Sequence, residues 1–164
     1  MKVICVSGTP GTGKTTISIR LSKELGFNYI GVNKLVSRHK ISEGYDEKRK
    51  TKIVDVDKLN RILIDEITKM KLNKKYKGII IDSHLSHYLP KKYVNFCIIT
   101  KCGISELSKR LKKKKFHKEK ILENLQSEIF EVCLNEARQR KHRIISADTT
   151  KGFNINQLIH KLGE

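Results

Sequence analysis

The feature that most constrains this chain is the run from residue 8 to residue 15, Gly-Thr-Pro-Gly-Thr-Gly-Lys-Thr. It matches the G-x-x-x-x-G-K-[ST] pattern, in which glycines allow a tight turn and successive backbone amides point inward around phosphate oxygens. An apolar stretch rich in β-branched residues precedes the run at residues 2–7, and a helical pattern follows it. Because the motif requires this strand–loop–helix order, we predict a phosphate-binding loop here.

Each residue type in the loop suits one part of nucleotide binding. Gly11 and Gly13 let the backbone approach the phosphates without a Cβ in the way. We expect Lys14 to reach the β- and γ-phosphates of ATP, and the Thr15 hydroxyl to ligate Mg²⁺. We expect Thr16 to lie near the α-phosphate. The positive end of the following helix dipole adds to this anion site.

The rest of the chain alternates apolar runs with helical patterns, which predicts an α/β fold. Five apolar runs are predicted strands: residues 2–7, 27–32, 77–82, 93–100 and 144–147. Helical spacing of apolar residues marks residues 15–25, 56–70, 105–115, 118–140 and 155–162, with a helical turn at 33–40. Continuous apolar runs are typical of parallel strands covered on both faces. Right-handed crossovers then give a three-layer α/β sandwich with a five-stranded parallel sheet, in a single domain spanning residues 1–164.

Two further details of this fold follow from the pattern. The helix at residues 118–140 is predicted to bury one stripe, made of Ile121, Leu125, Ile129, Val132 and Ala137. Residues 43–50 are polar and rich in turn formers, so they are predicted to be a mobile surface segment.

A carboxylate, Asp82, ends the apolar run 77–82. In phosphate-loop enzymes a carboxylate at the end of a neighbouring strand holds Mg²⁺ opposite the loop hydroxyl, so Asp82 is a predicted metal-site residue. His84 points to the same side if the strand continues, and could position an attacking water or an acceptor group; a surface histidine without a role is the alternative. His87 is predicted to be structural.

The charge balance points to a second kind of ligand. Lys and Arg number 35 against 17 acidic residues, a net charge of +18, and a nucleotide pocket needs only a few of these. Such an excess predicts attraction to RNA, while a lysine-rich proteome or a thermophile's charged surface is the alternative. The basic residues gather in two clusters: residues 109–120, and Arg138, Arg140, Lys141 and Arg143. Without interleaved aromatic residues, contact with RNA would be made to its backbone. One or two cations of the first cluster could instead neutralise a transferring phosphoryl group, and a solvated helix face is the remaining interpretation.

The remaining composition excludes several classes. No apolar run is long enough to cross a membrane, and the apolar stretch after Lys2 is too short for a signal peptide, so we expect a cytoplasmic protein, or a nuclear one in a eukaryotic source. Cys5, Cys97, Cys102 and Cys133 form no C-x-x-C pair and are expected to be reduced thiols. The guanine-reading N-K-x-D motif of regulatory GTPases is missing, which favours adenine as the base.

Several motifs in chain order resemble one family. They are the loop at residues 8–16, G-Y-D at 44–46, D-S-H at 82–84, Leu89-Pro90, Arg110-Leu111 and the run at 123–130. Together they resemble adenylate kinase isoenzyme 6, the coilin-interacting nuclear ATPase, and its archaeal relatives. The resemblance spans nearly the whole chain. Shikimate kinase-like enzymes share the phosphate loop but do not account for the motifs at residues 44–46 and 82–84.

The resemblance implies a P-loop nucleoside monophosphate kinase fold and Mg²⁺-dependent transfer of a phosphoryl group from ATP to AMP or a related acceptor. It also implies ATP hydrolysis, a role in late maturation of the small ribosomal subunit, and binding to the platform protein of the S-eleven family. A ribosome-assembly switch ATPase, with transfer to AMP incidental, stays open as the alternative. A basic RNA-binding module with a vestigial loop is disfavoured, because Lys14, Thr15 and Asp82 are all present.

The resemblance also assigns roles by position. The catalytic residues would be Lys14, Asp82, His84 and Arg110, and the donor phosphates would be held by Gly11, Gly13, Lys14, Thr15, Thr16 and Lys114. Thr15 and Asp82 would serve Mg²⁺. Residues of about 33–52 match the acceptor-binding segment, with Arg38 near the acceptor phosphate; about 113–123 match a short lid, and 146–150 the loop beside the donor base. Lys114 stands where the family often has arginine, which would grip phosphate bidentately, and Arg110 could compensate.

Overall fold

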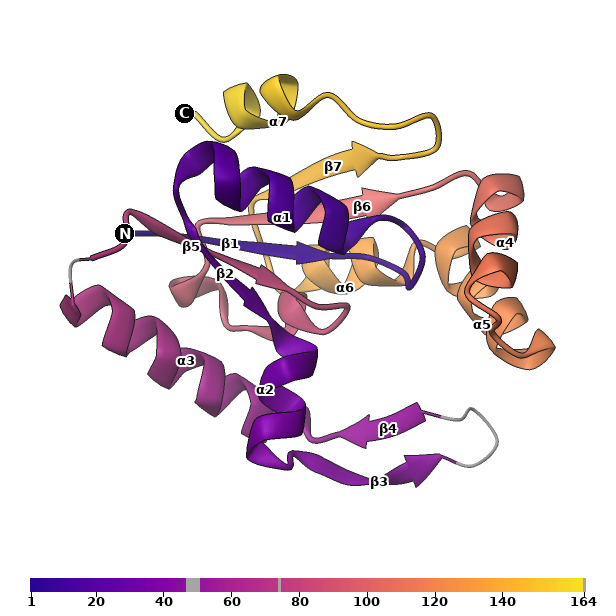
Figure 1. The fold of residues 1–164 in the computed structure, drawn as a ribbon, viewed down its shortest axis with the longest axis horizontal. Helices are drawn as coiled ribbons and strands as arrows, with labels where there is room; N and C mark the ends of the chain where they lie inside the picture. Colours follow the sequence, from indigo (N-terminus) through magenta and orange to yellow (C-terminus); the bar gives the residue numbers. More distant parts are fainter. Residues whose placement is uncertain (47–50, 74, 164) are drawn as a thin grey trace.

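A five-stranded parallel sheet forms the centre of the molecule, as the sequence predicts (Figure 1). The computed structural model describes residues 1–46, 51–73 and 75–163. The strands are β1 (Lys2–Ser7), β2 (Asn28–Gly31), β5 (Gly78–Asp82), β6 (Phe96–Lys101) and β7 (Ile144–Asp148). Their spatial order is β2-β5-β1-β6-β7, so β1 is paired on both sides, with β5 and β6.

Helices α2 (Val32–His39), α3 (Val56–Asn73) and α6 (Val132–Gln139) cover one face of the sheet, and α1 (Lys14–Leu25) and α7 (Ile155–Lys161) cover the other. Two more helices are α4 (Ile104–Lys113) and α5 (Lys118–Ile129). Two 3-10 turns, Ser86–Tyr88 and Lys91–Tyr93, lie between β5 and β6. The α/β class and the three layers are therefore confirmed. The predicted fourth strand begins only at Phe96, because the 3-10 turn already holds Tyr93.

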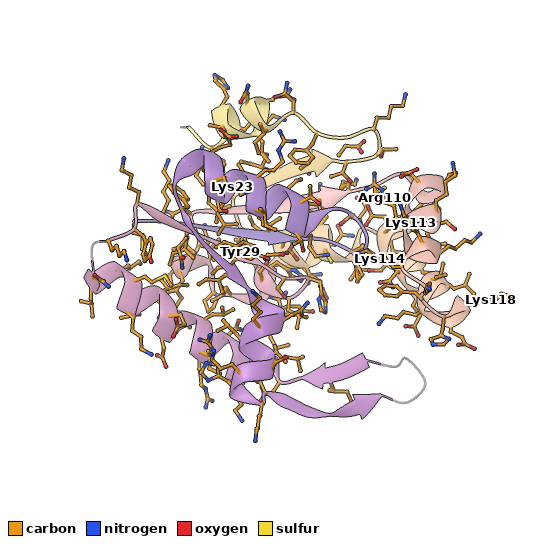
Figure 2. All side chains as sticks on the ribbon, viewed as in Figure 1. Lys23, Tyr29, Arg110, Lys113, Lys114 and Lys118 are labelled. Carbon is orange, nitrogen blue, oxygen red and sulfur yellow. The ribbon has the colours of Figure 1, made fainter. Side chains whose placement is uncertain are left out.

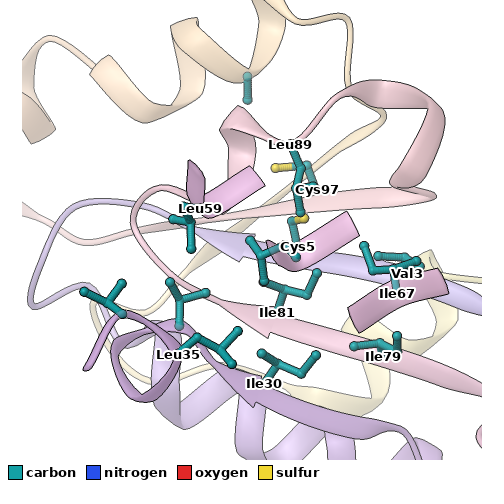
Figure 3. Close-up of a cluster of buried hydrophobic side chains, with 14 of the residues drawn as sticks. Val3, Cys5, Ile30, Leu35, Leu59, Ile67, Ile79, Ile81, Leu89 and Cys97 are labelled. Carbon is teal, nitrogen blue, oxygen red and sulfur yellow. The ribbon is translucent and has the colours of Figure 1, made fainter. Parts of the chain in front are cut away.

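The two hydrophobic cores follow from the alternation of side chains along a strand. Val3 and Cys5 of β1 face one side, where they pack with helices α2, α3 and α6. Figure 3 shows this cluster, in which Leu59 and Ile67 of α3 lie over the sheet. Ile4 and Val6 face the other side and pack with α1 and α7. Because both faces are covered, the strands appear in the sequence as continuous apolar runs.

Helices α4 and α5 stand apart from these layers, at the end of the sheet toward which the strands point (Figure 1). They have a small core of their own, in which Leu107 and Leu111 of α4 pack against Ile121 and Leu125 of α5. This pair of helices lies where the phosphate-binding loop leaves β1. The basic residues of the predicted lid are therefore placed beside that loop.

The prediction of a mobile segment at residues 43–50 is wrong for its first part. Residues 43–46 belong to β3 (Ser42–Asp46), which pairs in antiparallel fashion with β4 (Thr51–Val54). Residues 47–50 lie outside the described residues. Backbone hydrogen bonds can hold a hairpin whose side chains show no apolar period, and for that reason the sequence pattern missed it.

The prediction of one helix over residues 118–140 is also wrong. The chain breaks between α5 and α6, where Glu131 has φ of +50° and its carboxylate pairs with Lys101. Ile129 is 56% exposed and Val132 37% exposed, so the predicted buried stripe fails there, while Ala137 is buried. The physical reason is that α5 packs on α4 and α6 packs on the sheet, and one straight helix cannot do both.

All four cysteines are free thiols, as the sequence predicts; three of them are buried, and Cys133 is half-buried. No helix in the described part of the chain is long and apolar enough to cross a membrane.

The α3 helix allows a direct test of this core. Leu63 is fully buried against the sheet and Leu72, on the same helix, is 78% exposed. Leu63→Ala is expected to lower the free energy of unfolding by about 2–5 kcal/mol, because it leaves a cavity. Leu72→Ala is expected to change it by less than about 0.5 kcal/mol. Urea denaturation of both variants measures the difference, and equal effects would contradict the packing of α3 on the sheet.

Candidate active site

The loop between β1 and α1 has the backbone that phosphate binding requires. Gly8 has φ of +140°, and a Cβ there would clash with Thr100 of β6. Gly13 caps α1 in the left-handed conformation, with φ of +89°. The Thr12 hydroxyl donates to the carbonyl oxygen of Thr9 at 2.7 Å and lies 2.6 Å from the Thr100 hydroxyl. The loop is thus fixed both to itself and to the sheet.

Lys14 lies directly over this loop. Its Nζ donates to the carbonyl oxygens of Gly8 at 2.8 Å and Thr9 at 2.9 Å. Burial lowers the pKa of Lys14 to about 8, although the nearby Asp82 carboxylate acts in the opposite direction. The ammonium form still predominates at neutral pH. A half-buried cation beside a glycine-rich loop and a helix N-terminus attracts phosphate.

Asp82 is the centre of a second group of contacts. Its Oδ2 accepts hydrogen bonds from the Thr15 hydroxyl at 2.7 Å and from the Tyr29 hydroxyl at 2.9 Å. Burial, followed by the contact with Asp82, raises the pKa of Tyr29 well above its usual range, so the phenol remains a donor. A hydroxyl and a carboxylate are the oxygen ligands that Mg²⁺ prefers. The predicted metal pair therefore fits the ion, and sequence reasoning missed Tyr29.

The two histidines after β5 have different surroundings. His84 is exposed to solvent and lines a cavity that Lys14 and Asp82 also line. Desolvation by the neighbouring side chains, and then the Lys14 ammonium, lower the pKa of His84 to about 4, so its ring is neutral at pH 7. His87 is buried, with Nδ1 2.7 Å from the Ser7 hydroxyl and Nε2 2.8 Å from a Glu136 carboxylate oxygen. These contacts join β1 to α6 and agree with the structural role predicted for His87.

One cavity, of about 580 Å³, lies on the α1 side of the loop. Its floor consists of Gly11, Gly13, Lys14, Thr15 and Thr16. The opposite walls come from the end of α4, with Arg110, Lys113 and Lys114, and from the chain after β7, with Thr149, Gly152 and Phe153. All five predicted phosphate-binding loop residues and Lys114 therefore face one space.

A second cavity, of about 700 Å³, lies on the other side of Lys14. Tyr29, Asp82 and His84 line it, together with Asn33 and Lys34 of α2 and Lys120 of α5. Gly11, Lys14, Thr15 and Lys114 line both cavities. The two spaces thus meet at the loop lysine and threonine, an arrangement suited to a donor and an acceptor on either side of one phosphoryl group.

Arg110 is held more firmly than the sequence suggests. Its guanidinium donates to the Thr149 hydroxyl at 3.0 Å and the Thr149 carbonyl at 2.7 Å, and its Nε donates to Glu106 at 2.9 Å. Figure 2 shows Arg110, Lys113 and Lys114 together on the loop-facing side of α4. Arg110 therefore ties α4 to the chain after β7, and this second function could not be read from the sequence. Its catalytic role stays a prediction.

The acceptor-binding segment at about residues 33–52 stays a prediction. Two of its residues, Asn33 and Lys34, line the second cavity. Arg38 is exposed one helical turn farther along α2. The side chains of residues 45–52 lie outside the described ones. The role of Arg38 toward an acceptor phosphate stays a prediction.

Comparison with known proteins agrees with this geometry. A family model described as an AAA domain matches residues 4–131. The "Putative adenylate kinase" of Methanocaldococcus jannaschii is 38% identical over 147 residues, which are 90% of this chain and 76% of that protein. The chain therefore belongs to the family of these archaeal putative adenylate kinases. The adenylate kinase isoenzyme 6 homolog of Caenorhabditis elegans is 33% identical over 136 residues, 83% of this chain and 72% of that protein. The resemblance stated from the motifs is confirmed.

Solved structures support the fold alone. Deoxyadenosine kinase from M. mycoides with bound dATP has a TM-score of 0.57 at 18% identity, covering 100% of both chains. A gluconokinase from Sinorhizobium meliloti has a TM-score of 0.55 at 15% identity, covering 98% of this chain and 89% of the other.

The neutral state of His84 can be measured. In a pH titration followed by NMR, the His84 ring resonance is expected to shift with a midpoint near 4, whereas an unperturbed histidine titrates near 6.5. In the unfolded chain the same ring titrates near pH 6.5, so the unfolded state binds the proton at a higher pH than the folded state. The contribution of His84 to the free energy of unfolding is therefore lost as the pH falls from about 6.5 to 4. Lys14→Met should move the midpoint upward, because a repelling charge is removed. A wild-type midpoint near 6.5 would contradict the desolvation of the ring beside Lys14, and His84→Gln identifies the resonance.

Proposed function

We propose that this protein transfers the γ-phosphoryl group of ATP to a nucleoside monophosphate, with AMP as the first candidate. The observation that carries the proposal is the meeting of two cavities at Lys14 and Thr15, beside the Asp82 carboxylate. Relatives named as adenylate kinases support the same reaction class. In this proposal the α1-side cavity takes ATP and the other cavity takes the acceptor.

Different residues of the site would bind the donor phosphates, hold Mg²⁺ and contact the acceptor. The loop amides and Lys14 would bind the donor phosphates, and Lys113 and Lys114 would face the same space from α4. Thr15 and Asp82 would hold Mg²⁺, which when bound supplies charge neutralisation for the transferring group. His84, being neutral, can accept a hydrogen bond from an acceptor group or a water. Catalysis here would consist of positioning and electrostatic stabilisation.

Two segments would move around this centre, within a single kinase domain of residues 1–164. Residues of about 113–123 would form the lid, since they join α4 to α5 and include cavity residues Lys114, Phe116 and Lys120. Residues of about 33–52 would bind the acceptor, supported by Asn33 and Lys34. Closure of such segments excludes water and completes the charge around the phosphoryl group.

A switch ATPase in small-subunit maturation is the second candidate. Lys114 offers a point charge in place of a planar fork, and the Arg110 donors already contact Thr149 and Glu106. Both observations favour slow turnover, with His84 orienting water in place of an acceptor. Family resemblance would then make the platform protein of the S-eleven family the partner. ATP hydrolysis would change the affinity for that partner.

The basic surface would contact ribosomal RNA. Four lysines of the first cluster, Lys109, Lys112, Lys115 and Lys118, are exposed and lie outside the walls of the two cavities. Figure 2 places Lys118 at the outer end of these helices. In the second cluster, Arg140 and Arg143 lie over the rings of Tyr88 and Phe96. The four lysines are therefore the better candidates for phosphate contacts.

Kinase activity is tested by ADP production from Mg²⁺-ATP with and without AMP. A monophosphate kinase forms ADP rapidly only with AMP, at about two ADP per ATP consumed. Asp82→Asn is expected to lower kcat by about 10²–10³-fold, as removal of one charge-stabilising group does. Asp65→Asn, at an exposed carboxylate of α3, is the matched control and should match the wild type. Slow ADP formation indifferent to AMP would instead favour the switch ATPase.

RNA contact is tested by the salt dependence of binding. Changing Lys109, Lys112, Lys115 and Lys118 together to glutamine should weaken affinity for a ribosomal RNA fragment. The slope of log K against log salt should become less steep by about 0.7–0.9 for each phosphate that the variant no longer neutralises. The control changes Lys58, Lys69, Lys71 and Lys75 to glutamine, removing the same charge from the α3 region. Equal weakening in the two variants would indicate a general charge effect and contradict a defined surface.

A further inference from the structure

Tyr29 makes a contact that neither the sequence motifs nor the family assignment explains. It lies on β2, whose register sets Gly31 beside Asp82 of the adjacent strand β5. Its hydroxyl donates to Asp82 Oδ2 at 2.9 Å, on the same oxygen that accepts from Thr15. We propose that Tyr29 is a positioning residue, which holds the Asp82 carboxylate in the orientation that receives the hydrated Mg²⁺ of the nucleotide. The inference rests on the proposed function.

The distribution of donors on the carboxylate supports this role. Both hydroxyl donors contact Oδ2, and within the described ranges of the chain no side-chain donor contacts Oδ1. The Asp82 carboxylate can rotate about its Cβ–Cγ bond. A single hydrogen bond to Oδ2 would still allow the plane of the carboxylate to rotate. Two donors from different elements, α1 and β2, restrict this rotation. Oδ1 is then left for the cation, in the wall of the cavity that Lys14 and His84 also line.

The backbone near Tyr29 makes room for this contact. A Cβ added at Gly31 would lie 3.0 Å from the Tyr29 hydroxyl oxygen, closer than an ordinary contact. Gly31 has φ of −84°, which any residue can adopt, so its backbone conformation does not require glycine. The space that Gly31 leaves open is the space that the phenol occupies.

Tyr29 also lines the cavity assigned to the acceptor, together with Asn33 and Lys34. One side chain therefore forms part of the acceptor wall and contacts the carboxylate assigned to the cation. An acceptor that contacts the ring could change the orientation of the Asp82 carboxylate. Because Tyr29 contacts the carboxylate assigned to the cation, loss of its hydroxyl should change the Mg²⁺ dependence of nucleotide binding more than the affinity measured without Mg²⁺.

The test measures binding of a fluorescent ADP analogue to the full chain while Mg²⁺ is varied. Tyr29→Phe removes only the hydroxyl and keeps the ring. We expect the half-saturating Mg²⁺ concentration to rise about 10-fold, a typical effect of removing a hydrogen bond to a metal-site carboxylate. Affinity in EDTA should stay within about 2-fold of the wild type, and excess Mg²⁺ should restore wild-type binding. A merely structural role would lower affinity with and without Mg²⁺ alike.

Tyr88→Phe is the matched control. The Tyr88 hydroxyl also donates to a carboxylate, Glu136 Oε1, at 2.8 Å, beside the same cavity but on a carboxylate that does not contact Thr15. The same atom is removed, and the Mg²⁺ dependence should not change. The proposal is overturned if Tyr29→Phe leaves the Mg²⁺ dependence unchanged, if Tyr88→Phe shifts it equally, or if wild-type binding does not depend on Mg²⁺.

Gly31→Ala provides a second variant that leaves Tyr29 intact. Its Cβ should displace the phenol by a few tenths of an ångström, so the half-saturating Mg²⁺ concentration should rise by less than in Tyr29→Phe. No rise would count against the proposal. Because binding is measured without an acceptor, the result does not depend on phosphoryl transfer. A chain that fails the AMP assay but shows the Tyr29 effect would contradict the kinase proposal and support this one.

Discussion

The pairing of β1 with a strand on each side is the constraint on which the rest of the molecule depends. Every residue from Val3 to Ser7 is buried, so β1 cannot shift without exposing apolar surface. Its register places Val6 beside Asp82, and the register of β2 places Gly31 on the other side of Asp82. The hydroxyls of Thr15 and Tyr29 meet one carboxylate oxygen because of these two registers.

Electrostatics in the site follow from this geometry. Lys14 lies half-buried over backbone carbonyls, and its charge in turn helps to keep His84 neutral. A chain with a net charge of +18 thereby contains a neutral imidazole beside its phosphate-binding loop. Lys109, Lys112, Lys115 and Lys118, on and between α4 and α5, are exposed and lie outside the cavity walls, while Lys113 and Lys114 line a cavity. Basic residues from one stretch of the chain therefore lie both in the pocket wall and on the outer surface.

Sequence patterns succeeded where local chemistry decides the structure. Gly8 and Gly13 adopt positive φ angles that other residues rarely adopt, and an apolar run ending in Asp82 predicts a buried strand with a carboxylate at the sheet edge. Sequence patterns failed where contacts between distant segments decide the structure. The break at Glu131 arises because α5 packs on α4, and the hairpin of β3 and β4 arises from backbone pairing without an apolar period. The contacts of Arg110 with Thr149 likewise join residues 39 positions apart.

The sequence by itself determined the phosphate-binding loop and the five strands of the sheet, and it singled out Lys14, Thr15 and Asp82 as candidate phosphate- and metal-binding residues. It could do so because steric limits, side-chain period and phosphate chemistry act over a few neighbouring residues. Only the tertiary structure decided that Tyr29 donates to Asp82, that Arg110 holds the chain after β7, and that two cavities share Lys14. These contacts depend on strand order and register. Both are set by burial of the whole core, which no local pattern records.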